Sequence, residues 1–329
     1  MEFLMQPFLG EAVWVWIALM GFVATVLFLD LAVFNKHDHV IEMKESLKLA
    51  SVYVCFGILF GMFVWYRNGA DDALDYYTVY IIEQTLSLDN LFVMSIIFTS
   101  FSIPRQYQHR LLVYGIIGVV ILRGATIAAG AALVQQYDWI LLVFAAILFY
   151  TGVKLFFVAG EEEHEDYSQK PISKFLAKHL RVTPQLEGHR FFIKVPSVNN
   201  VKKAVWHATP LFLALCVIEL TDLLFAFDSV PAALAITTDP YIVFTANIFA
   251  ILGLRAIFFA MEHIIHRFVY LKYSLAVLLM FIAGKVFYTQ LAGEHIPAAL
   301  SLGLTVVILA AGVIISLMRT KKGDNHTHV

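Results

Sequence analysis

Long apolar runs recur along the chain and are separated by short polar segments. Each run could cross about 30 Å of hydrocarbon as a helix, because an α-helix rises about 1.5 Å per residue. The runs lie at residues 12–34, 47–67, 76–101, 111–133, 138–159, 207–236, 241–262, 271–291 and 297–318. The pattern therefore predicts an all-α polytopic membrane protein with about nine transmembrane helices.

Basic residues are concentrated in alternate connections between these runs. They include Lys36, Lys44, Lys48, Arg105, Arg110, Lys170, Lys174, Lys178, Arg267, Lys272, Arg319, Lys321 and Lys322. The intervening connections, such as 71–75 and 237–240, are acidic or neutral. Because cytoplasmic loops carry an excess of Lys and Arg, we expect the N-terminus outside and the C-terminus in the cytoplasm.

Two parts of the chain repeat the same series of motifs. Glu83–Asn90 in the third run and Asp222–Ser229 in the sixth each read as an acid, five residues, Asp and a small polar residue. Arg123 precedes Gly152 by 29 positions, and Arg255 precedes Gly284 by the same distance. The two triplets begin their crossings from opposite sides, so they predict two inverted-topology three-helix repeats, an architecture of secondary transporters.

This organisation divides the chain into five parts. The predicted parts are an N-terminal helix pair at 1–75, a first repeat at 76–159, a cytoplasmic loop at 160–206, a second repeat at 207–291, and a last helix with a cytoplasmic tail at 292–329. The loop carries a basic amphipathic pattern over 172–180 that could lie on the anionic inner leaflet of the bilayer.

Composition supports a membrane protein and narrows its chemistry. Of 329 residues, 60% are hydrophobic and only 15% are charged, which excludes an ordinary soluble globule. The net charge of −2 and the lack of a basic run give no sign of nucleic-acid binding. No phosphate-binding loop and no nucleophile–base arrangement occurs, so we expect neither ATP hydrolysis nor another enzyme activity, and no permanently bound cofactor.

Carboxylates inside the apolar runs are the strongest sign of function. A charged side chain at the centre of a membrane helix costs roughly 2.5–3.5 kcal/mol on insertion scales. The candidate acids are Glu83, Asp89, Glu219, Asp222 and Asp228, against the bases Arg123, Arg255 and Lys285. The excess of acids would be neutralised by one divalent cation. Carboxylates with the Asn90 amide and the Ser229 hydroxyl are hard oxygen donors suited to Mn, Ca or Mg.

Helix geometry separates these acids into two groups. Residues seven apart differ by about 20° around a helix, so Glu83 shares a face with Asn90, and Asp222 shares one with Ser229. Asp89 and Asp228 are turned by about 120° from these faces. We expect Pro231 to break the sixth helix and free a carbonyl beside Asp228, which would let all the acids approach one ion.

The sequence allows two roles for several of these side chains. Glu83, Glu219 and Asp222 are either cation ligands or ion-pair partners of Arg123 and Arg255. Asn247 is either an ion ligand or a hydrogen-bonding residue between helices. Asp30 is either interfacial or part of a gate.

The motifs resemble the TerC/Alx family of bacterial inner-membrane proteins from about residue 13 to 290. The similar stretches are 29–34, 83–92, 108–115, 208–211, 222–232 and 238–255. Val230 and Phe227 depart from the usual family pattern, and neither has a ligand side chain.

The resemblance implies manganese(II) export from the cytoplasm across the bacterial inner membrane, with Glu83, Asp89, Asp222 and Asp228 as metal residues. Calcium and magnesium are candidate weaker substrates, and protons are the expected counter-ions. The alternative is a non-transporting membrane scaffold or assembly factor, in which the buried charges only lock helices together. Neither alternative is decided by the sequence.

Overall fold

A computed structural model describes residues 2–29, 42–137, 139–158, 166–184, 186–197, 200–261, 271–294 and 296–324. In these ranges eight helices are long and apolar enough to cross a membrane. They are α3 (Met43–Asn68), α4 (Ala70–Ser100), α5 (Arg105–Gln136), α6 (Ile140–Val158), α8 (Pro210–Leu234), α9 (Pro240–Met261), α10 (Leu271–Ala292) and α11 (Ala298–Asp324).

The first predicted span is only partly described. Its helix, α2 (Val13–Leu29), is apolar and has 17 residues, which is shorter than the other candidates. Asp30 and the residues after it to 41 lie outside the described ranges. The multi-pass helical architecture is confirmed, with eight candidate spans and this shorter helix where about nine spans were predicted.

Small elements complete the fold. They are α1 (Glu2–Met5), β1 (Pro7–Phe8), β2 (Glu11–Ala12), the 3-10 turn η2 (Tyr167–Gln169), α7 (Pro171–Leu180), β3 (Phe192–Ser197) and β4 (Asn200–Ala208). β3 and β4 form an antiparallel hairpin in which Phe192 pairs with Ala208. The sixth span therefore begins at Pro210 rather than at 207, because the preceding residues belong to β4 and proline is favoured in a first helical turn.

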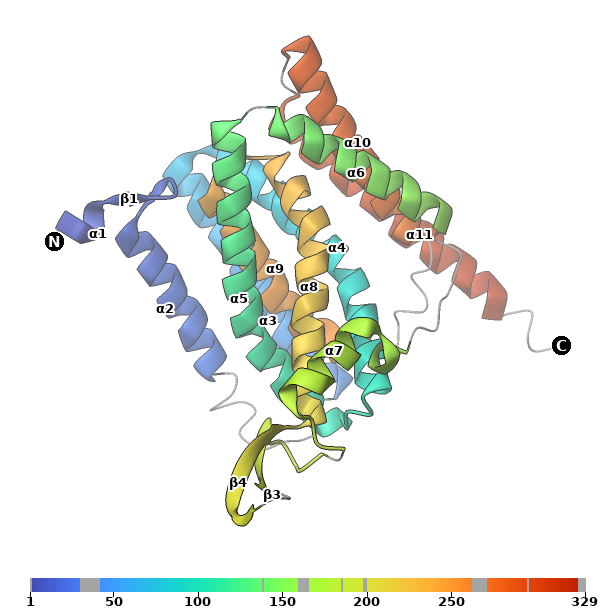
Figure 1. Ribbon diagram of the computed structural model, residues 1–329. Coiled ribbons are helices and arrows are strands. Elements are labelled where there is room, and N and C mark those ends of the chain that lie inside the picture. Colours follow the sequence, from blue (N-terminus) through green and yellow to red (C-terminus); the bar gives the residue numbers. More distant parts are fainter. Residues whose placement is uncertain are drawn as a thin grey trace.

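α9 is the central helix of the bundle. Every side chain from Pro240 to Ala260 except that of Ile257 is buried, as expected for a helix that is apolar on all sides. It packs against α3, α4 and α5, and in Figure 1 it lies behind α5 and α8. Polar residues on α9 consequently lie inside the helix bundle.

A second layer is formed by α6, α10 and α11, which lie together on one side of Figure 1. α6 and α10 approach closely at Gly152 on α6, where an added Cβ would lie 2.8 Å from the carbonyl oxygen of Ala276 on α10. A side chain at this position would push the two helices apart. The layer therefore depends on the small residue that ends the motif Phe149–Gly152, which recurs as Phe281–Gly284.

Corresponding helices of the two predicted repeats are neighbours. α5 contacts α9, and α6 has extensive contacts with α10. α4 and α5 both contact α8. The repeats are thus interleaved, while their inverted symmetry and the five-part division of the chain stay predictions.

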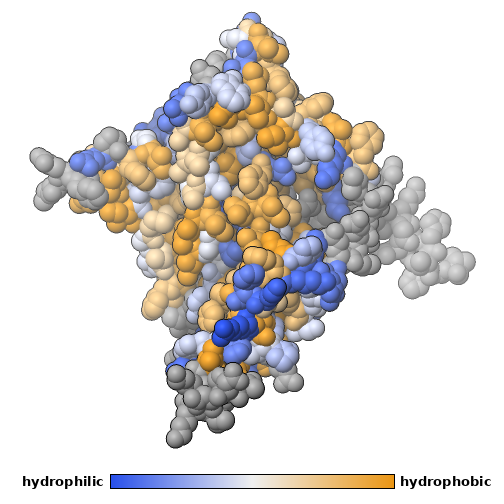
Figure 2. All heavy atoms as spheres, viewed as in Figure 1, coloured by the Kyte–Doolittle hydropathy of each residue, from blue (hydrophilic) through white to orange (hydrophobic). Residues whose placement is uncertain are grey.

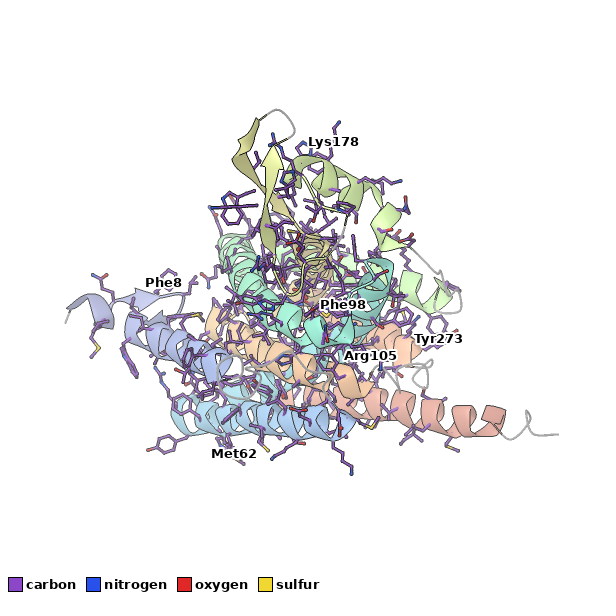
Figure 3. All side chains as sticks on the ribbon, turned by 90° about the horizontal axis from the view of Figure 1, so that it is seen from below. Phe8, Met62, Phe98, Arg105, Lys178 and Tyr273 are labelled. Atoms are coloured by element: carbon purple, nitrogen blue, oxygen red, sulfur yellow. The ribbon has the colours of Figure 1, made fainter. Side chains whose placement is uncertain are left out.

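One end of the helix bundle is covered by the segment that contains α7. At the α7 end, residues of 167–191 pack over a buried cluster that includes Phe98 and Leu211. Figure 3 looks from this end and shows Phe98 inside the bundle, whereas Lys178 lies outward on α7 and Met62 lies at the periphery on α3. Figure 2 shows hydrophilic side chains gathered over α7 and hydrophobic ones over the neighbouring helices. The opposite end, which includes Asp239, is called the Asp239 end below.

Candidate functional site

Arg123 on α5 is the centre of a buried polar cluster. Its side chain is 1% exposed, and one nitrogen, Nη1, donates to Glu83 at 2.9 Å, Ser229 at 2.8 Å and Asn247 at 2.6 Å. Nε and Nη2 donate to the two carboxylate oxygens of Asp222 at 3.3 and 3.4 Å. One guanidinium therefore links α4, α5, α8 and α9.

Two amides complete this cluster. Asn247 donates to Glu83 Oε1 at 2.9 Å, so it joins Glu83 and Arg123 in a closed triangle. Asn90 donates to Asp222 Oδ1 at 3.3 Å, and its own side-chain oxygen is buried with no partner among the described residues. We call the set Glu83, Asn90, Arg123, Asp222, Ser229 and Asn247 the Arg123 cluster.

The sequence predicted which residues of α4 and α8 would share this cluster. Glu83 with Asn90, and Asp222 with Ser229, were expected on common helix faces because they are seven residues apart. All four lie in the Arg123 cluster. The helical-face prediction is therefore confirmed.

Asp228 lies away from this cluster, as its helical angle requires. It is half-buried and accepts a hydrogen bond from Thr151 on α6 at 3.1 Å. The expected helix break at Pro231 is wrong, because α8 continues through it to Leu234. With only three residues after the proline, the helix end can tolerate a missing amide donor. Asp89 is on α4, and its side chain lies outside the described part of the structure.

Thr151 is a site residue that the sequence did not identify. It belongs to the repeated Phe149–Gly152 motif, which was used only to recognise the repeats. A hydroxyl inside a repeated motif was the available signal, although the sequence could not show which acid it would face.

A second buried ion pair lies on the α7 side of the Arg123 cluster. Glu219, one helical turn before Asp222 on α8, lies 4.0 Å from Arg255 on α9. Neither its two carboxylate oxygens nor the three guanidinium nitrogens have a hydrogen-bond partner among the described residues. Both arginines therefore lie beside acids, but the two differ sharply: every nitrogen of Arg123 makes a hydrogen bond, whereas no nitrogen of Arg255 does so among the described residues.

Two glycines of α5 make room for this pair. A Cβ at Gly115 would lie 2.7 Å from Glu219 and 2.8 Å from Arg255, and one at Gly118 would overlap the Glu219 carboxylate. The carboxylate therefore lies directly against the α5 backbone. This close approach explains why α5 carries small residues in the middle of a membrane helix.

The charges and donors define what the Arg123 cluster can bind. It contains two carboxylates and one guanidinium, so it carries one net negative charge when all three are ionised. Within the described residues, no three His, Cys, Asp or Glu side chains form a group that could hold a metal ion. A cation entering the Arg123 cluster would use two carboxylates together with amide and hydroxyl oxygens, in the place that the guanidinium now occupies.

The fold and the buried charges define a class of protein: a multi-pass helical membrane protein with an ionic cluster between its helices. Comparison with known proteins identifies the group within this class. Residues 68–324 match the integral membrane protein TerC family, and the chain belongs to that family.

Similar proteins occur in several bacteria. An uncharacterized membrane protein of Rickettsia conorii is 44% identical over 310 residues, covering 94% of this chain and 99% of the relative. One of Myxococcus xanthus is 39% identical over 306 residues, covering 93% and 92%. The Escherichia coli K12 protein named "Putative membrane-bound redox modulator Alx" is 41% identical over 303 residues, covering 89% and 91%. No solved structure matches the chain.

Proposed function

We propose that this protein is a secondary transporter that exports divalent cations from the cytoplasm, with manganese(II) as its principal substrate. The observation that carries the proposal is the convergence of Glu83, Asp222 and three neutral polar side chains on one buried point between four helices. Ionisable residues among membrane helices are costly, and they typically mark substrate or ion pathways and proton relays.

Ligand chemistry supports a hard cation. The cluster offers carboxylate, amide and hydroxyl oxygens, which suit manganese, calcium and magnesium. The Asn90 oxygen has no partner among the described residues, so it is available as a ligand. Manganese is chosen over the other two because the sequence resembles a family of manganese exporters.

Arg123 has a defined role in this mechanism. Its guanidinium neutralises Glu83 and Asp222 when no substrate is present. A divalent ion that takes its place must displace it from both carboxylates, and after release the guanidinium returns. The arginine would thus act as a tethered cation that keeps the empty carrier stable, since an uncompensated buried charge costs several kcal/mol.

The direction of export rests on charge distribution. The predicted orientation puts α7 and the basic connections in the cytoplasm, and the Asp239 end outside. Asp228, six residues after Asp222 and thus about 9 Å farther along α8, would meet an ion after the Arg123 cluster. Protons that replace the ion on the carboxylates would complete an exchange cycle.

A flux measurement tests the proposal. Purified protein in liposomes should move manganese, faster when a pH gradient is imposed, and Asp222→Asn or Glu83→Gln should reduce the rate at least tenfold. Asp239→Asn, a matched change outside the spans, should leave it near wild type. Flux equal to that of protein-free liposomes would overturn the proposal.

One observation favours a second function, that of a non-transporting membrane scaffold. Each nitrogen of the Arg123 guanidinium already makes at least one hydrogen bond, as expected for a residue that holds helices together. A scaffold predicts that Glu83→Gln combined with Arg123→Gln retains cellular function, because neutral side chains can still link the helices. A transporter predicts that the combined variant folds but exports no manganese.

A further inference from the structure

A cavity lies at the Asp239 end, apart from the Arg123 cluster. Its volume is about 380 Å³. It is lined by residues of α4, α6, α8, α10 and α11 and of the connections that follow α8 and α10. Leu234 is 12 residues beyond Asp222, which corresponds to about 18 Å along α8. The cavity is therefore a separate feature and does not depend on the proposed transport function.

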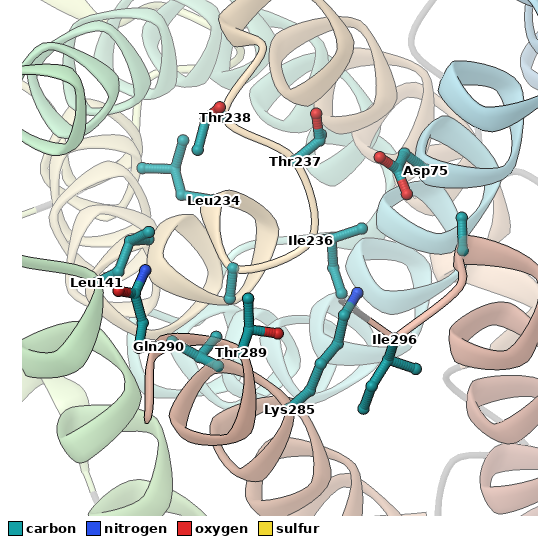
Figure 4. A pocket seen from close by; sticks show the side chains of 13 residues that line it. Asp75, Leu141, Leu234, Ile236, Thr237, Thr238, Lys285, Thr289, Gln290 and Ile296 are labelled. Atoms are coloured by element: carbon teal, nitrogen blue, oxygen red, sulfur yellow. The ribbon is translucent and has the colours of Figure 1, made fainter. Parts of the chain in front are cut away.

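The cavity brings together two opposite charges that do not form an ion pair. Figure 4 shows the Asp75 carboxylate of α4 and the Lys285 ammonium of α10 on either side of Ile236, both directed into the cavity. Lys285 donates to Ser301 of α11 at 3.3 Å. Among the described residues, no carboxylate–ammonium contact within 4.0 Å joins Asp75 to Lys285. Each charge is thus open to a ligand.

The remaining lining is divided by polarity. Thr237, Thr238, Thr289 and Gln290 contribute hydroxyl and amide groups, whereas Leu141, Leu234 and Val286 are apolar. The volume is near the lower end of the range for small-molecule sites, about 300–1,000 Å³. A ligand here would be small, polar at two points and partly hydrocarbon.

Charge balance selects among possible ligands. A free metal cation would be attracted by Asp75 but repelled by Lys285. A simple anion would be attracted by Lys285 but repelled by Asp75. A zwitterion satisfies both groups, since its ammonium can donate to the carboxylate while its anionic group accepts from the lysine. We propose that this cavity binds a small zwitterion that carries a primary ammonium and a carboxylate or phosphate group.

Two sources could supply this chemistry: a free solute and the ethanolamine phosphate headgroup of a membrane lipid. Both present a primary ammonium and an anion on a short hydrocarbon linker. Phosphatidylcholine is a useful comparison, because its quaternary ammonium has no N–H to donate to Asp75.

The test uses the full-length protein in nanodiscs and phosphoethanolamine as the soluble probe, with binding measured by calorimetry. In phosphatidylcholine nanodiscs the wild type should bind the probe, and Asp75→Asn and Lys285→Met should each weaken binding at least tenfold. Lys272→Met, on the same helix but outside the cavity, should bind like wild type. Ethanolamine is only a cation and inorganic phosphate only an anion, so each should bind at least tenfold more weakly than phosphoethanolamine.

The choice of lipid distinguishes the two sources. If the natural ligand is a headgroup, phosphatidylethanolamine nanodiscs will block the soluble probe; if it is a free solute, binding will be the same in both lipids. Absence of probe binding in phosphatidylcholine nanodiscs, or equal binding by the wild type and both cavity variants, would overturn the proposal. Thermal unfolding of each variant identifies any that failed to fold. In that case the comparison of phosphoethanolamine with ethanolamine and inorganic phosphate on the wild-type protein still tests the proposal.

Discussion

Asn247 on α9 accepts the shortest hydrogen bond of the Arg123 guanidinium, 2.6 Å long, and its amide group donates to Glu83. The Asn247 side chain is fully buried, so water cannot replace either bond. The amide therefore fixes the relative positions of an acid and a base that come from two other helices. This neutral residue is as central to the cluster as the charges are.

Replacing Asn247 with leucine should destabilise the protein. Leucine cannot form the hydrogen bonds that Asn247 makes with Glu83 and with Arg123, so one polar group on each of these buried residues loses a partner. Each unsatisfied group should lower the free energy of unfolding by about 1–3 kcal/mol. The expected result is a clearly lower midpoint of thermal unfolding in detergent.

Thr245→Val provides the matched control on the same helix. The Thr245 hydroxyl is also fully buried but bonds only to carbonyls of its own helix, Tyr241 at 2.8 Å and Ile242 at 3.1 Å. Its replacement should have a much smaller effect. Equal losses for both variants would show that Asn247 contributes only helix packing.

Arg123 and Glu83 should be energetically coupled. Arg123→Gln alone leaves two buried carboxylates uncompensated and should cost about 3–5 kcal/mol. Adding Glu83→Gln removes one of those charges, so the double variant should be less destabilised than the sum of the single changes by about 1–3 kcal/mol. Unfolding midpoints of the four proteins measure this coupling, and strict additivity would contradict the ion pair.

Much of this cluster could be predicted from helical periodicity. The seven-residue spacing of Glu83 with Asn90, and of Asp222 with Ser229, put each pair on one face, and buried charge required a basic partner. These arguments use only local geometry and solvation, which are the same in any membrane helix. The angle of an unbroken helix also turns Asp228 away from this face, but the expected break at Pro231 led to the prediction that Asp228 would join the other acids, and it lies beside Thr151 instead.

The partners across helices could not be predicted in the same way. Arg123 and Arg255 stand in repeated motifs, yet every nitrogen of Arg123 makes a hydrogen bond, whereas Arg255 lies 4.0 Å from Glu219 and makes no hydrogen bond among the described residues. The difference depends on helix positions, such as the close approach of Glu219 to Gly118. Pro231 was expected to break α8 beside Asp228, but α8 continues through it to Leu234.

Gly118→Ala should disturb the second ion pair. The new methyl group would overlap the Glu219 carboxylate, and forcing additional volume into a packed site typically costs about 1–3 kcal/mol. Gly284→Ala on α10 is the matched control, because a Cβ there meets nothing within 4 Å. That variant should be neutral or slightly stabilised, since alanine favours helix by up to about 1 kcal/mol over glycine.

The two glycine variants are compared by thermal unfolding in detergent. A lower midpoint for Gly118→Ala with an unchanged midpoint for Gly284→Ala would confirm the close approach. If both variants behave alike, the Glu219 side chain can move away from α5 at little cost, and the packing argument fails.

Asp239, outside the spans, should make stability depend on pH. It caps α9 by accepting from the amides of Tyr241 at 2.8 Å and Ile242 at 3.4 Å. Burial nevertheless raises the pKa of Asp239 above its ordinary 3.8, and the nearby Asp72 and Glu11 act in the same direction. The folded protein therefore holds this proton more tightly than the unfolded chain. Its stabilising contribution is complete below the ordinary pKa and is lost as pH rises through the folded pKa.

Asp239→Asn should consequently raise the unfolding midpoint at neutral pH, because asparagine caps a helix as well as aspartate does and stays neutral. The gain should shrink as the pH is lowered to about 4, where aspartate in the wild type also becomes neutral. Asp166→Asn is a control for which the change in stability should depend on pH in the opposite direction. Hydrogen bonds from the Ser168 hydroxyl and amide lower the pKa of Asp166, so its contribution is present at neutral pH and is lost in acid. A gain for Asp239→Asn that stays constant across this pH range would show that burial of the carboxylate is not its cause.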